Sequence, residues 1–304
     1  MSFCDLATPG VQGLRPYEPG KPLSELEREY GVRDAIKLAS NENPLGPSPA
    51  ALEAVRGALG EIARYPDGNG FDLKRALAHR YGVDLPGITL GNGSNDVLEI
   101  IARAFLQPGL EAVFSQHAFA VYPIVTQAIG ATARVVPAHD GSRGPRYGHD
   151  LEAMLAAITD KTRLVFIANP NNPTGTWLKR DELEAFLWRV PRQVSVVLDE
   201  AYVEYVNEPD YPDSIPWLAS FPNLVLTRTF SKAYGLAGLR VGFALSHPEV
   251  ADVLNRVRQP FNVNSLALTA AAAALTDRAH LEASQKLNQM GMAQWHEMLT
   301  ELGL

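Results

Sequence analysis

The sequence predicts an α/β protein with two parts: a large domain built on a mostly parallel, doubly wound sheet, and a smaller helical or α+β domain. Three observations support this prediction. Short apolar runs rich in β-branched residues alternate with segments of helical periodicity between residues 70 and 246, as expected of strands joined by crossover helices. From residue 247 onward the periodicity is helical only. The chain of 304 residues is also long enough to bury a core without disulfides or metal ions.

The first 40 residues are expected to form an irregular arm, because prolines at 9, 16, 19 and 22 interrupt any periodicity. Within this arm only Leu23–Tyr30 has the pattern of a short amphipathic helix. Residues 40–49 consist of turn-forming residues, and Pro49 stands where the next helix, 50–59, is expected to begin.

The rest of the chain divides into strands and helices by the same criteria. The expected strands are 88–91, 111–115, 132–136, 164–168, 194–198, 224–227 and 241–245. The expected helices are 71–81, 94–106, 123–129, 151–158, 180–189, 248–258, 264–275 and 278–302. Strands that are apolar throughout indicate a sheet covered on both faces. We therefore predict an arm that contributes to the small domain (1–40), a large domain (41–257) and a small C-terminal domain (258–304).

The composition excludes several classes of protein. The net charge of −7 provides no basic footprint for nucleic acid. The single cysteine, Cys4, excludes an intrachain disulfide, and the histidines have no spacing typical of a metal site. No apolar run reaches the length of a transmembrane helix, and the first ten residues lack a signal-peptide pattern. We expect a cytoplasmic protein that binds neither nucleic acid nor a membrane, with Cys4 as a free thiol of no assigned role.

Two motifs beside predicted strands have both a functional and a structural interpretation. Gly91-Asn92-Gly93 leads into a helix at Ser94-Asn95, whose backbone N–H groups suit a phosphate, although an ordinary helix cap explains the same residues. Residue 96 is aspartate, so the dinucleotide fingerprint lacks its third glycine. The second motif, 169–175, offers the amide of Asn172 at a strand end, or is simply a proline-glycine turn.

Two further groups of polar residues follow the strands 194–198 and 224–227. Asp199 comes at the carboxyl end of its strand, where α/β sheets bind ligands, although a helix-capping role is equally common there. Thr229, Ser231 and Lys232 follow the next strand, and Arg240 lies eight residues after the lysine. Hydroxyls and a guanidinium suit a phosphate, and a lysine in a dry pocket can bond covalently to a carbonyl. A lone lysine is more often a solvated surface charge.

Together and in this order, these motifs resemble the fold-type-I, pyridoxal-phosphate-dependent aminotransferases. Within that group the sequence is most similar to the histidinol-phosphate aminotransferases. The markers, which extend from about residue 14 to the end, are Leu14-Arg15-Pro16-Tyr17, the segment from Leu38 to Pro44, Arg64-Tyr65-Pro66-Asp67, and Arg-Thr-Phe-Ser-Lys-Ala-Tyr-Gly-Leu-Ala-Gly-Leu-Arg-Val-Gly from Arg228 to Gly242.

The resemblance implies pyridoxal 5'-phosphate as cofactor and Lys232 as the catalytic residue, which would attach to the cofactor and then move protons. Asp199 would pair with the pyridine nitrogen, and Phe119 would stack on the ring, with Tyr122 as the competing choice. The remaining cofactor-binding residues are polar groups at the ring 3-oxygen or the phosphate: Asn172 and Tyr202 at the oxygen, and Ser94, Asn95, Thr229, Ser231 and Arg240 at the phosphate.

The resemblance also implies a homodimer with the active site at the interface. Tyr65 would reach the phosphate of the cofactor in the partner subunit, although Tyr65-Pro66-Asp67 also fits a plain turn. Tyr17 and Asn43 would lie near the substrate.

The implied reaction is transfer of the amino group of L-histidinol phosphate to 2-oxoglutarate, which yields imidazole acetol phosphate and L-glutamate in histidine biosynthesis. The alternatives are an aminotransferase with another amino donor, a phosphothreonine-type decarboxylase of the same fold, and a non-catalytic binder of the cofactor. Relatives continue beyond residue 304 with strands and an arginine that holds the anionic end of the substrate. We therefore expect the small domain to be incomplete and the amino donor to be undetermined by the sequence.

Overall fold

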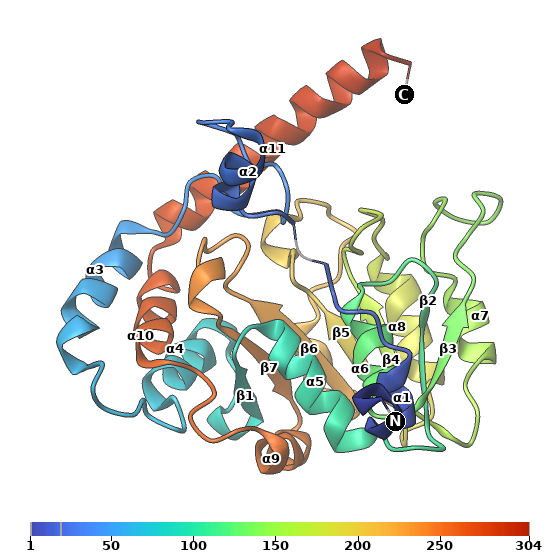
Figure 1. The fold of residues 1–304 in the computed structure, drawn as a ribbon. Coiled ribbons are helices and arrows are strands. Elements are labelled where there is room, and N and C mark those ends of the chain that lie inside the picture. Colours follow the sequence, from blue (N-terminus) through green and yellow to red (C-terminus); the bar gives the residue numbers. More distant parts are fainter. Residues whose placement is uncertain (1, 19, 304) are drawn as a thin grey trace.

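A computed structural model describes residues 2–18 and 20–303. Residues 1, 19 and 304, which fall within the predicted arm and the predicted C-terminal domain, lie outside the described residues. The centre of the molecule is a seven-stranded sheet of order β1-β7-β6-β5-β4-β2-β3 (Figure 1). Its strands are β1 (Ile88–Gly91), β2 (Glu111–Ser115), β3 (Thr132–Val136), β4 (Thr162–Ala168), β5 (Ser195–Asp199), β6 (Leu224–Thr229) and β7 (Gly242–Ser246).

The sheet is mostly parallel, which confirms the predicted fold class. Strands β2 to β6 pair in parallel with their neighbours, whereas β7 is antiparallel to both β6 and β1. The segment between β6 and β7 contains only a 3₁₀ turn, Ala237–Leu239. A parallel return requires a long crossover, so this short connection reverses the direction of the chain. The antiparallel strand is the one departure from the predicted sheet.

The helices lie within a few residues of their predicted bounds. In chain order they are α1 (Pro9–Gln12), α2 (Leu23–Tyr30), α3 (Pro49–Ala58), α4 (Phe71–Tyr81), α5 (Ser94–Phe105), α6 (Val121–Ala128), α7 (Leu151–Ala156), α8 (Arg180–Arg189), α9 (Pro248–Val257), α10 (Ser265–Ala274) and α11 (Arg278–Glu301). Helix α6 begins two residues before Pro123, because a proline is tolerated in the first turn. Helix α1 was not predicted, since four residues are too few to show a period.

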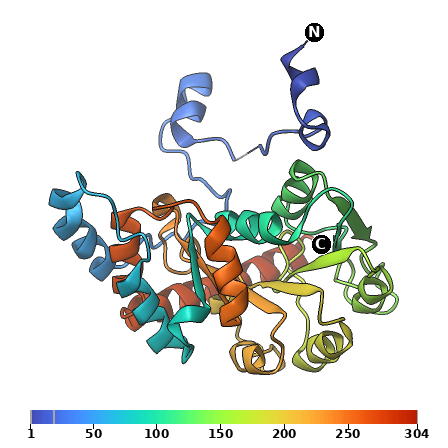
Figure 2. The ribbon, with the colours of Figure 1, turned by 90° about the horizontal axis from the view of Figure 1, so that it is seen from below.

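Helices cover both faces of the sheet (Figure 2). Strand β4 shows why, since its consecutive side chains point to opposite faces. Leu164 and Phe166 join a core with residues of α5, α6 and α9, whereas Val165 and Ile167 join a second core with residues of α4, α7, α8 and α10. The apolar strands are thus buried on both sides, as their composition predicts.

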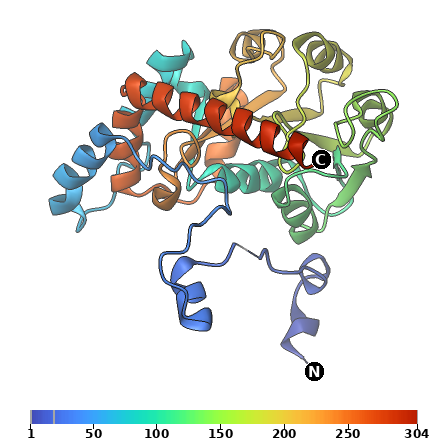
Figure 3. The same ribbon diagram turned by 90° about the horizontal axis from the view of Figure 1, so that it is seen from above.

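The N-terminal arm extends away from this layered body (Figure 3), and α11 lies over the body and projects beyond it (Figure 1). In the arm, Gly10 approaches the end of α6 so closely that a Cβ would stand 2.1 Å from the carbonyl oxygen of Gln127. Helix α11 begins against the body, and its later turns expose Met290, Met292 and Trp295. Within the described residues, none of the helices has both the length and the apolarity needed to cross a membrane. The cytoplasmic location remains a prediction.

A buried ion pair joins β6 to the end of β5. Arg228 is 7% exposed and donates from Nε to Glu200 Oε2 at 2.8 Å, and its Nη2 forms an ion pair with the same oxygen at 2.8 Å. Ser214 donates to the other carboxylate oxygen at 2.5 Å, and the ring of Tyr81 lies 4.8 Å from the guanidinium. Because each charge is fully partnered, the pair is tolerated in the core, but loss of either member leaves the other charge uncompensated.

We expect Glu200→Gln to lower the free energy of unfolding by about 3–5 kcal/mol, because the Arg228 guanidinium would stay buried without its carboxylate. Urea denaturation of the cofactor-free protein measures this change. Glu53→Gln is the matched control, since Glu53 pairs with Arg56 on the surface with side chains 79% and 66% exposed, where ion pairs contribute little. Equal effects of the two substitutions would contradict the assigned role of the buried pair.

Candidate active site

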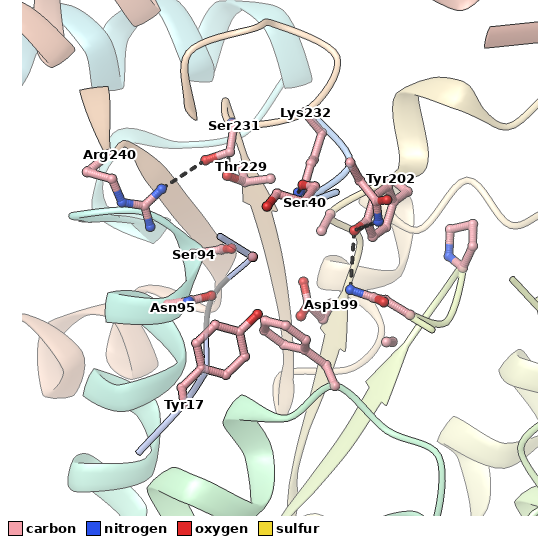
Figure 4. A pocket seen from close by; sticks show the side chains of 17 residues that line it. Tyr17, Ser40, Ser94, Asn95, Asp199, Tyr202, Thr229, Ser231, Lys232 and Arg240 are labelled. Carbon is pink, nitrogen blue, oxygen red and sulfur yellow. Dashed lines mark hydrogen bonds between the residues drawn. The ribbon is translucent and has the colours of Figure 1, made fainter. Parts of the chain in front are cut away.

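A cavity of about 400 Å³ opens at the carboxyl ends of β4, β5 and β6 (Figure 4). All the predicted cofactor-binding residues except Tyr65 line it: Ser94, Asn95, Phe119, Asn172, Asp199, Tyr202, Thr229, Ser231, Lys232 and Arg240. Tyr17, predicted near the substrate, lines it as well. The order of strands brings these residues together, because parallel strands end at one edge of the sheet.

One end of the cavity is suited to an anion. Ser94 and Asn95 form the first turn of α5, where backbone N–H groups have no partner within the helix. The guanidinium of Arg240 faces this turn and is held by Ser231 Oγ at 3.3 Å and the carbonyl of Ala237 at 3.1 Å from Nη1. Hydroxyls, amides and a planar guanidinium together match the donor set that binds a phosphate.

Two glycines allow this close arrangement. Gly93 has φ of +87°, and a Cβ there would lie 2.3 Å from Arg240 Nη2. Gly242, at the start of β7, passes so near α5 that a Cβ would lie 2.4 Å from the backbone nitrogen of Ser94. A side chain at either position would occupy the space where the helix N-terminus and the guanidinium meet. The anion-binding end therefore depends on the absence of these two Cβ atoms.

Asp199 forms the floor of the cavity as the last residue of β5. It is 4% exposed and accepts hydrogen bonds from Tyr122 Oη at 2.9 Å and Thr227 Oγ1 at 3.1 Å. Burial raises the pKa of Asp199 to about 6, and these two donors oppose the rise because they stabilise the ionised form. A carboxylate so placed binds a cationic partner that enters the cavity.

The two candidate aromatic residues, Phe119 and Tyr122, have different positions. Phe119 lines the cavity, whereas Tyr122 is fully buried and stacks on Phe166 at 4.8 Å between ring centroids. The Tyr122 hydroxyl points to Asp199 from below. Of the two rings, only Phe119 is in a position to contact a ligand in the cavity, and Tyr122 instead positions the carboxylate.

Lys232 projects into the cavity from the loop after β6. Its Nζ donates to the backbone carbonyl of Ser40 at 2.7 Å and lies 5.6 Å from the centroid of the Tyr202 ring. Burial, assisted by the charges of Arg240 and Lys37, lowers the pKa of this amine below its ordinary value, and Glu42 opposes the change. A lowered pKa increases the fraction of neutral amine, which is the nucleophilic form.

The hydroxyl oxygen of Tyr202 accepts two amide hydrogen bonds. Asn41 Nδ2 lies at 3.0 Å and Asn172 Nδ2 at 3.3 Å from this oxygen. Burial raises the pKa of Tyr202, so its proton remains on the hydroxyl and is available to a ligand. The predicted pair of Asn172 and Tyr202 is thus brought together, with Asn41 as a third member.

Two predicted residues lie outside the cavity. Tyr65 is 83% exposed and stacks on Phe261 with 4.8 Å between the ring centroids. Its expected contact with the cofactor of a partner subunit stays a prediction. Asn43 does not line the cavity, because its Nδ2 donates to the carbonyl of Ala233 and to Ser284 Oγ, both at 2.9 Å. Asn43 thus ties the Lys232 loop to α11, and its role near the substrate stays a prediction.

The structure adds lining residues that the sequence analysis did not assign, chiefly Gly20, Ser40 and Asn41. They come from the arm and from the turn-rich segment 40–49. The only available signal was that Ser40 and Asn41 fall within a marker of the resemblance, since turn residues show no period that would orient them.

Comparisons with known proteins show the family to which the chain belongs. The sequence pattern described as aminotransferase class I and II matches residues 33–304. The chain belongs to this class of aminotransferases. Within it, histidinol-phosphate aminotransferase 1 of Nitrosococcus oceani is 62% identical over 302 residues, which are 99% of this chain and 80% of the relative. Histidinol-phosphate aminotransferase 2 of Pseudomonas fluorescens Pf-5 is 64% identical over 304 residues, with the same coverage.

A solved structure extends this agreement to the fold. The crystal structure of histidinol-phosphate aminotransferase from Sinorhizobium meliloti in complex with pyridoxal-5'-phosphate is 34% identical to this chain with a TM-score of 0.81. The match covers 91% of this chain and 73% of that one. The predicted fold-type-I architecture and the resemblance in sequence are both confirmed.

We expect Tyr122→Phe to raise the pKa of Asp199 above its value of about 6, because one of the two donors to the carboxylate is lost. The stability that a raised carboxyl pKa provides is fully present below the ordinary value of 3.8 and is lost as the pH rises through the folded-state value. The free energy of unfolding lost through Tyr122→Phe should therefore be larger at pH 8 than at pH 4. Urea denaturation of the cofactor-free protein measures this loss at each pH.

The control for this prediction is the same substitution made in an Asp199→Asn background, where no carboxyl group remains to titrate. There the cost of Tyr122→Phe should not change with pH. If Tyr122→Phe lowers the free energy of unfolding by an amount independent of pH even when Asp199 is present, then Tyr122 does not affect the pKa of Asp199.

Proposed function

We propose that the protein catalyses pyridoxal-phosphate-dependent transfer of the amino group of L-histidinol phosphate to 2-oxoglutarate, in histidine biosynthesis. The observation that carries the proposal is the cavity itself, where the polar residues implied by the resemblance converge from separate segments of the chain. Relatives at 56–64% identity named histidinol-phosphate aminotransferase support the choice of amino donor.

The donor set fits pyridoxal phosphate at each of its polar groups. The phosphate would lie at the first turn of α5 with Arg240, Thr229 and Ser231, where the two glycines let the guanidinium and the helix N-terminus come together. The ring would lie on Phe119, with its nitrogen at Asp199. When bound, this cofactor supplies an electron-withdrawing ring that accepts the electrons of the substrate Cα–H bond.

Lys232 has two tasks in this mechanism. Its neutral amine, favoured by the lowered pKa, would hold the cofactor covalently by condensing with its aldehyde, with release of water. When free, the same Nζ would carry the proton that leaves the substrate α-carbon to the cofactor carbon. The Ser40 carbonyl, 2.7 Å from Nζ, orients the free amine at the cavity.

Asp199 and Tyr202 keep the charges in place during this proton transfer. The Asp199 carboxylate would hold a proton on the ring nitrogen, since an ion pair in a buried site strongly favours both charged forms. Tyr202 and Asn172 would donate to the ring oxygen and fix the plane of the ring. Asp199 and Tyr202 would exchange no proton with the substrate carbon. Their effect would be to orient the ring and to stabilise its charge.

The proposed reaction predicts a specific absorbance change. The protein loaded with pyridoxal phosphate should convert its cofactor to the pyridoxamine form when L-histidinol phosphate alone is added, and 2-oxoglutarate should restore the spectrum. Lys232→Ala should lower the rate of this conversion by at least about 10³-fold, because it removes both the nucleophile and the proton carrier.

The control is Lys161→Ala, an exposed lysine outside the cavity, which should leave the rate unchanged. Retained conversion in Lys232→Ala would contradict the mechanism. Conversion with aromatic amino acids but not with L-histidinol phosphate would contradict the assigned donor, and a loaded protein that responds to no amino donor would indicate a non-catalytic binder.

The phosphate position predicts a second result. Gly93→Ala should weaken the binding of pyridoxal phosphate about tenfold or more, because the new Cβ would displace the end of the Arg240 side chain. Gly109→Ala is a matched control, since Gly109 has φ of +90° but no atom within 4 Å of its Cβ position. Equal affinities of the two variants for pyridoxal phosphate, measured by equilibrium titration, would show that the phosphate does not bind beside Arg240.

A homodimer is part of the same proposal. The exposed stack of Tyr65 on Phe261 and the exposed arm offer aromatic surface for a second copy of the chain. Sedimentation equilibrium should give twice the monomer mass. A mixture of Lys232→Ala and Tyr65→Ala subunits should recover activity in hybrid dimers, because one of the two sites would then contain both residues. No recovery in a proven hybrid would contradict the role of Tyr65 across the interface.

A further inference from the structure

The turn formed by Ser40 and Asn41, which both line the proposed active site, has an unusual backbone. Their φ angles are +74° and +50°, so two consecutive residues with side chains lie in the left-handed region. This conformation is unfavourable for residues that carry a Cβ, although asparagine tolerates it better than most. Such conformations persist where surrounding contacts hold them, and they concentrate at functional sites. The contacts of this turn therefore indicate what it does.

Contacts on both sides hold the turn in place. Lys37 Nζ and Glu42 Oε1 form an ion pair at 2.7 Å, which closes the segment 37–42 around the turn. Within the turn, the Ser40 carbonyl accepts a hydrogen bond from Lys232 Nζ at 2.7 Å. Ser40, Lys232 and Tyr202 lie on the same side of the cavity (Figure 4). The turn thus adjoins two of the residues that would contact the cofactor.

The side chain of Asn41 is directed at Tyr202. Its Nδ2 donates to Tyr202 Oη at 3.0 Å, and Asn172 Nδ2 donates to the same oxygen at 3.3 Å. A phenol oxygen can accept two hydrogen bonds and donate one. Because the two amides occupy both acceptor sites, the Tyr202 proton is left for a ligand in the cavity, which all three residues line.

The amide of Asn41 also strengthens Tyr202 as a donor. A hydrogen bond accepted by a hydroxyl oxygen polarises its O–H bond, so the two bonds reinforce each other. Burial raises the pKa of Tyr202, and the hydrogen bond from Asn41 opposes this rise. A glycine would adopt the same left-handed turn with less strain. The contribution of the asparagine at this position is therefore its amide.

We propose that Asn41 is a positioning residue for Tyr202: its amide occupies one acceptor site of the phenol oxygen and so directs the phenol proton to the ring 3-oxygen of bound pyridoxal phosphate. This inference rests on the proposed function, because it requires a ligand with that oxygen beside Tyr202. Asn41 acts through the phenol and not by touching the ring oxygen. Its removal therefore weakens cofactor binding only when the phenol and the ring oxygen are both present.

A double-mutant cycle on the dissociation constant of pyridoxal phosphate tests this role, by equilibrium titration of the cofactor-free chain. Asn41→Gly removes the amide and keeps a residue that favours the left-handed turn. With Tyr202 present it should weaken binding about threefold or more, because the phenol proton is no longer directed to the ligand. Tyr202→Phe should itself weaken binding about tenfold. In that background, Asn41→Gly should change the dissociation constant by less than about 1.5-fold.

A second readout uses 3-deoxypyridoxal 5'-phosphate, which lacks the ring oxygen and otherwise matches the cofactor. Asn41→Gly should leave the affinity for this analogue unchanged, because the analogue accepts no proton from the phenol. Asp34→Gly is the matched control, since Asp34 has φ of +61°, is exposed and lies outside the cavity. It also introduces a glycine at a left-handed position and should leave the affinity for both ligands unchanged.

The results that would overturn the inference are distinct from those that would overturn the proposed function. Equal losses from Asn41→Gly with and without the phenol, or with both ligands, would show that Asn41 acts on the turn or on the cofactor directly. Unchanged affinity for pyridoxal phosphate in Asn41→Gly would show that the amide does not direct the proton. Unchanged affinity in Tyr202→Phe would place the ring oxygen elsewhere, which overturns the proposed orientation of the cofactor and this inference with it.

Discussion

The burial of the Asp199 carboxylate is the constraint on which the rest of the structure depends. A carboxylate deep in a sheet is unfavourable unless donors surround it, and here they come from α6 and from the neighbouring strand β6. The position of Asp199 thus fixes the register of β5 against β6, where it pairs with Thr227. It also fixes the depth at which a positively charged ring can enter the cavity.

Glu200, the next residue in the chain, is a second buried carboxylate at the end of the same strand. Consecutive side chains of a strand point to opposite faces, so Asp199 faces the cavity and Glu200 faces the core. Glu200 is fully buried and paired with Arg228, whereas Asp199 has only neutral donors, and burial raises its pKa to about 6. Of these two carboxylates, the one in the cavity is the one whose side-chain partners among residues 2–18 and 20–303 are hydroxyl groups.

Most of the fold could be predicted from the sequence because the strands are short, apolar and separated by clear helical periods. The direction of β7 could not be predicted. It depends on the path of the segment 230–241, which is too short for a parallel crossover, and not on the composition of that segment. Among the site residues, those directly after strands, such as Asp199 and Lys232, were predictable from topology and resemblance. Asn43 and Asn41 lie in a segment of turn residues, where no period indicates which side chain points inward. The contact of Tyr122 with Asp199 joins residues 77 apart in sequence and has no local signal.

The segment 40–46 links parts of the molecule that belong to different layers. The Ser40 carbonyl accepts from Lys232, Asn43 bridges the Lys232 loop to Ser284 of α11, and the Gly46 carbonyl lies 3.1 Å from Nε2 of His280, also on α11. These contacts act as a mechanical linkage. A displacement of α11 would shift the same short segment whose Ser40 and Asn41 line the cavity. The position of the long helix and the shape of the rim are thus coupled through these hydrogen bonds.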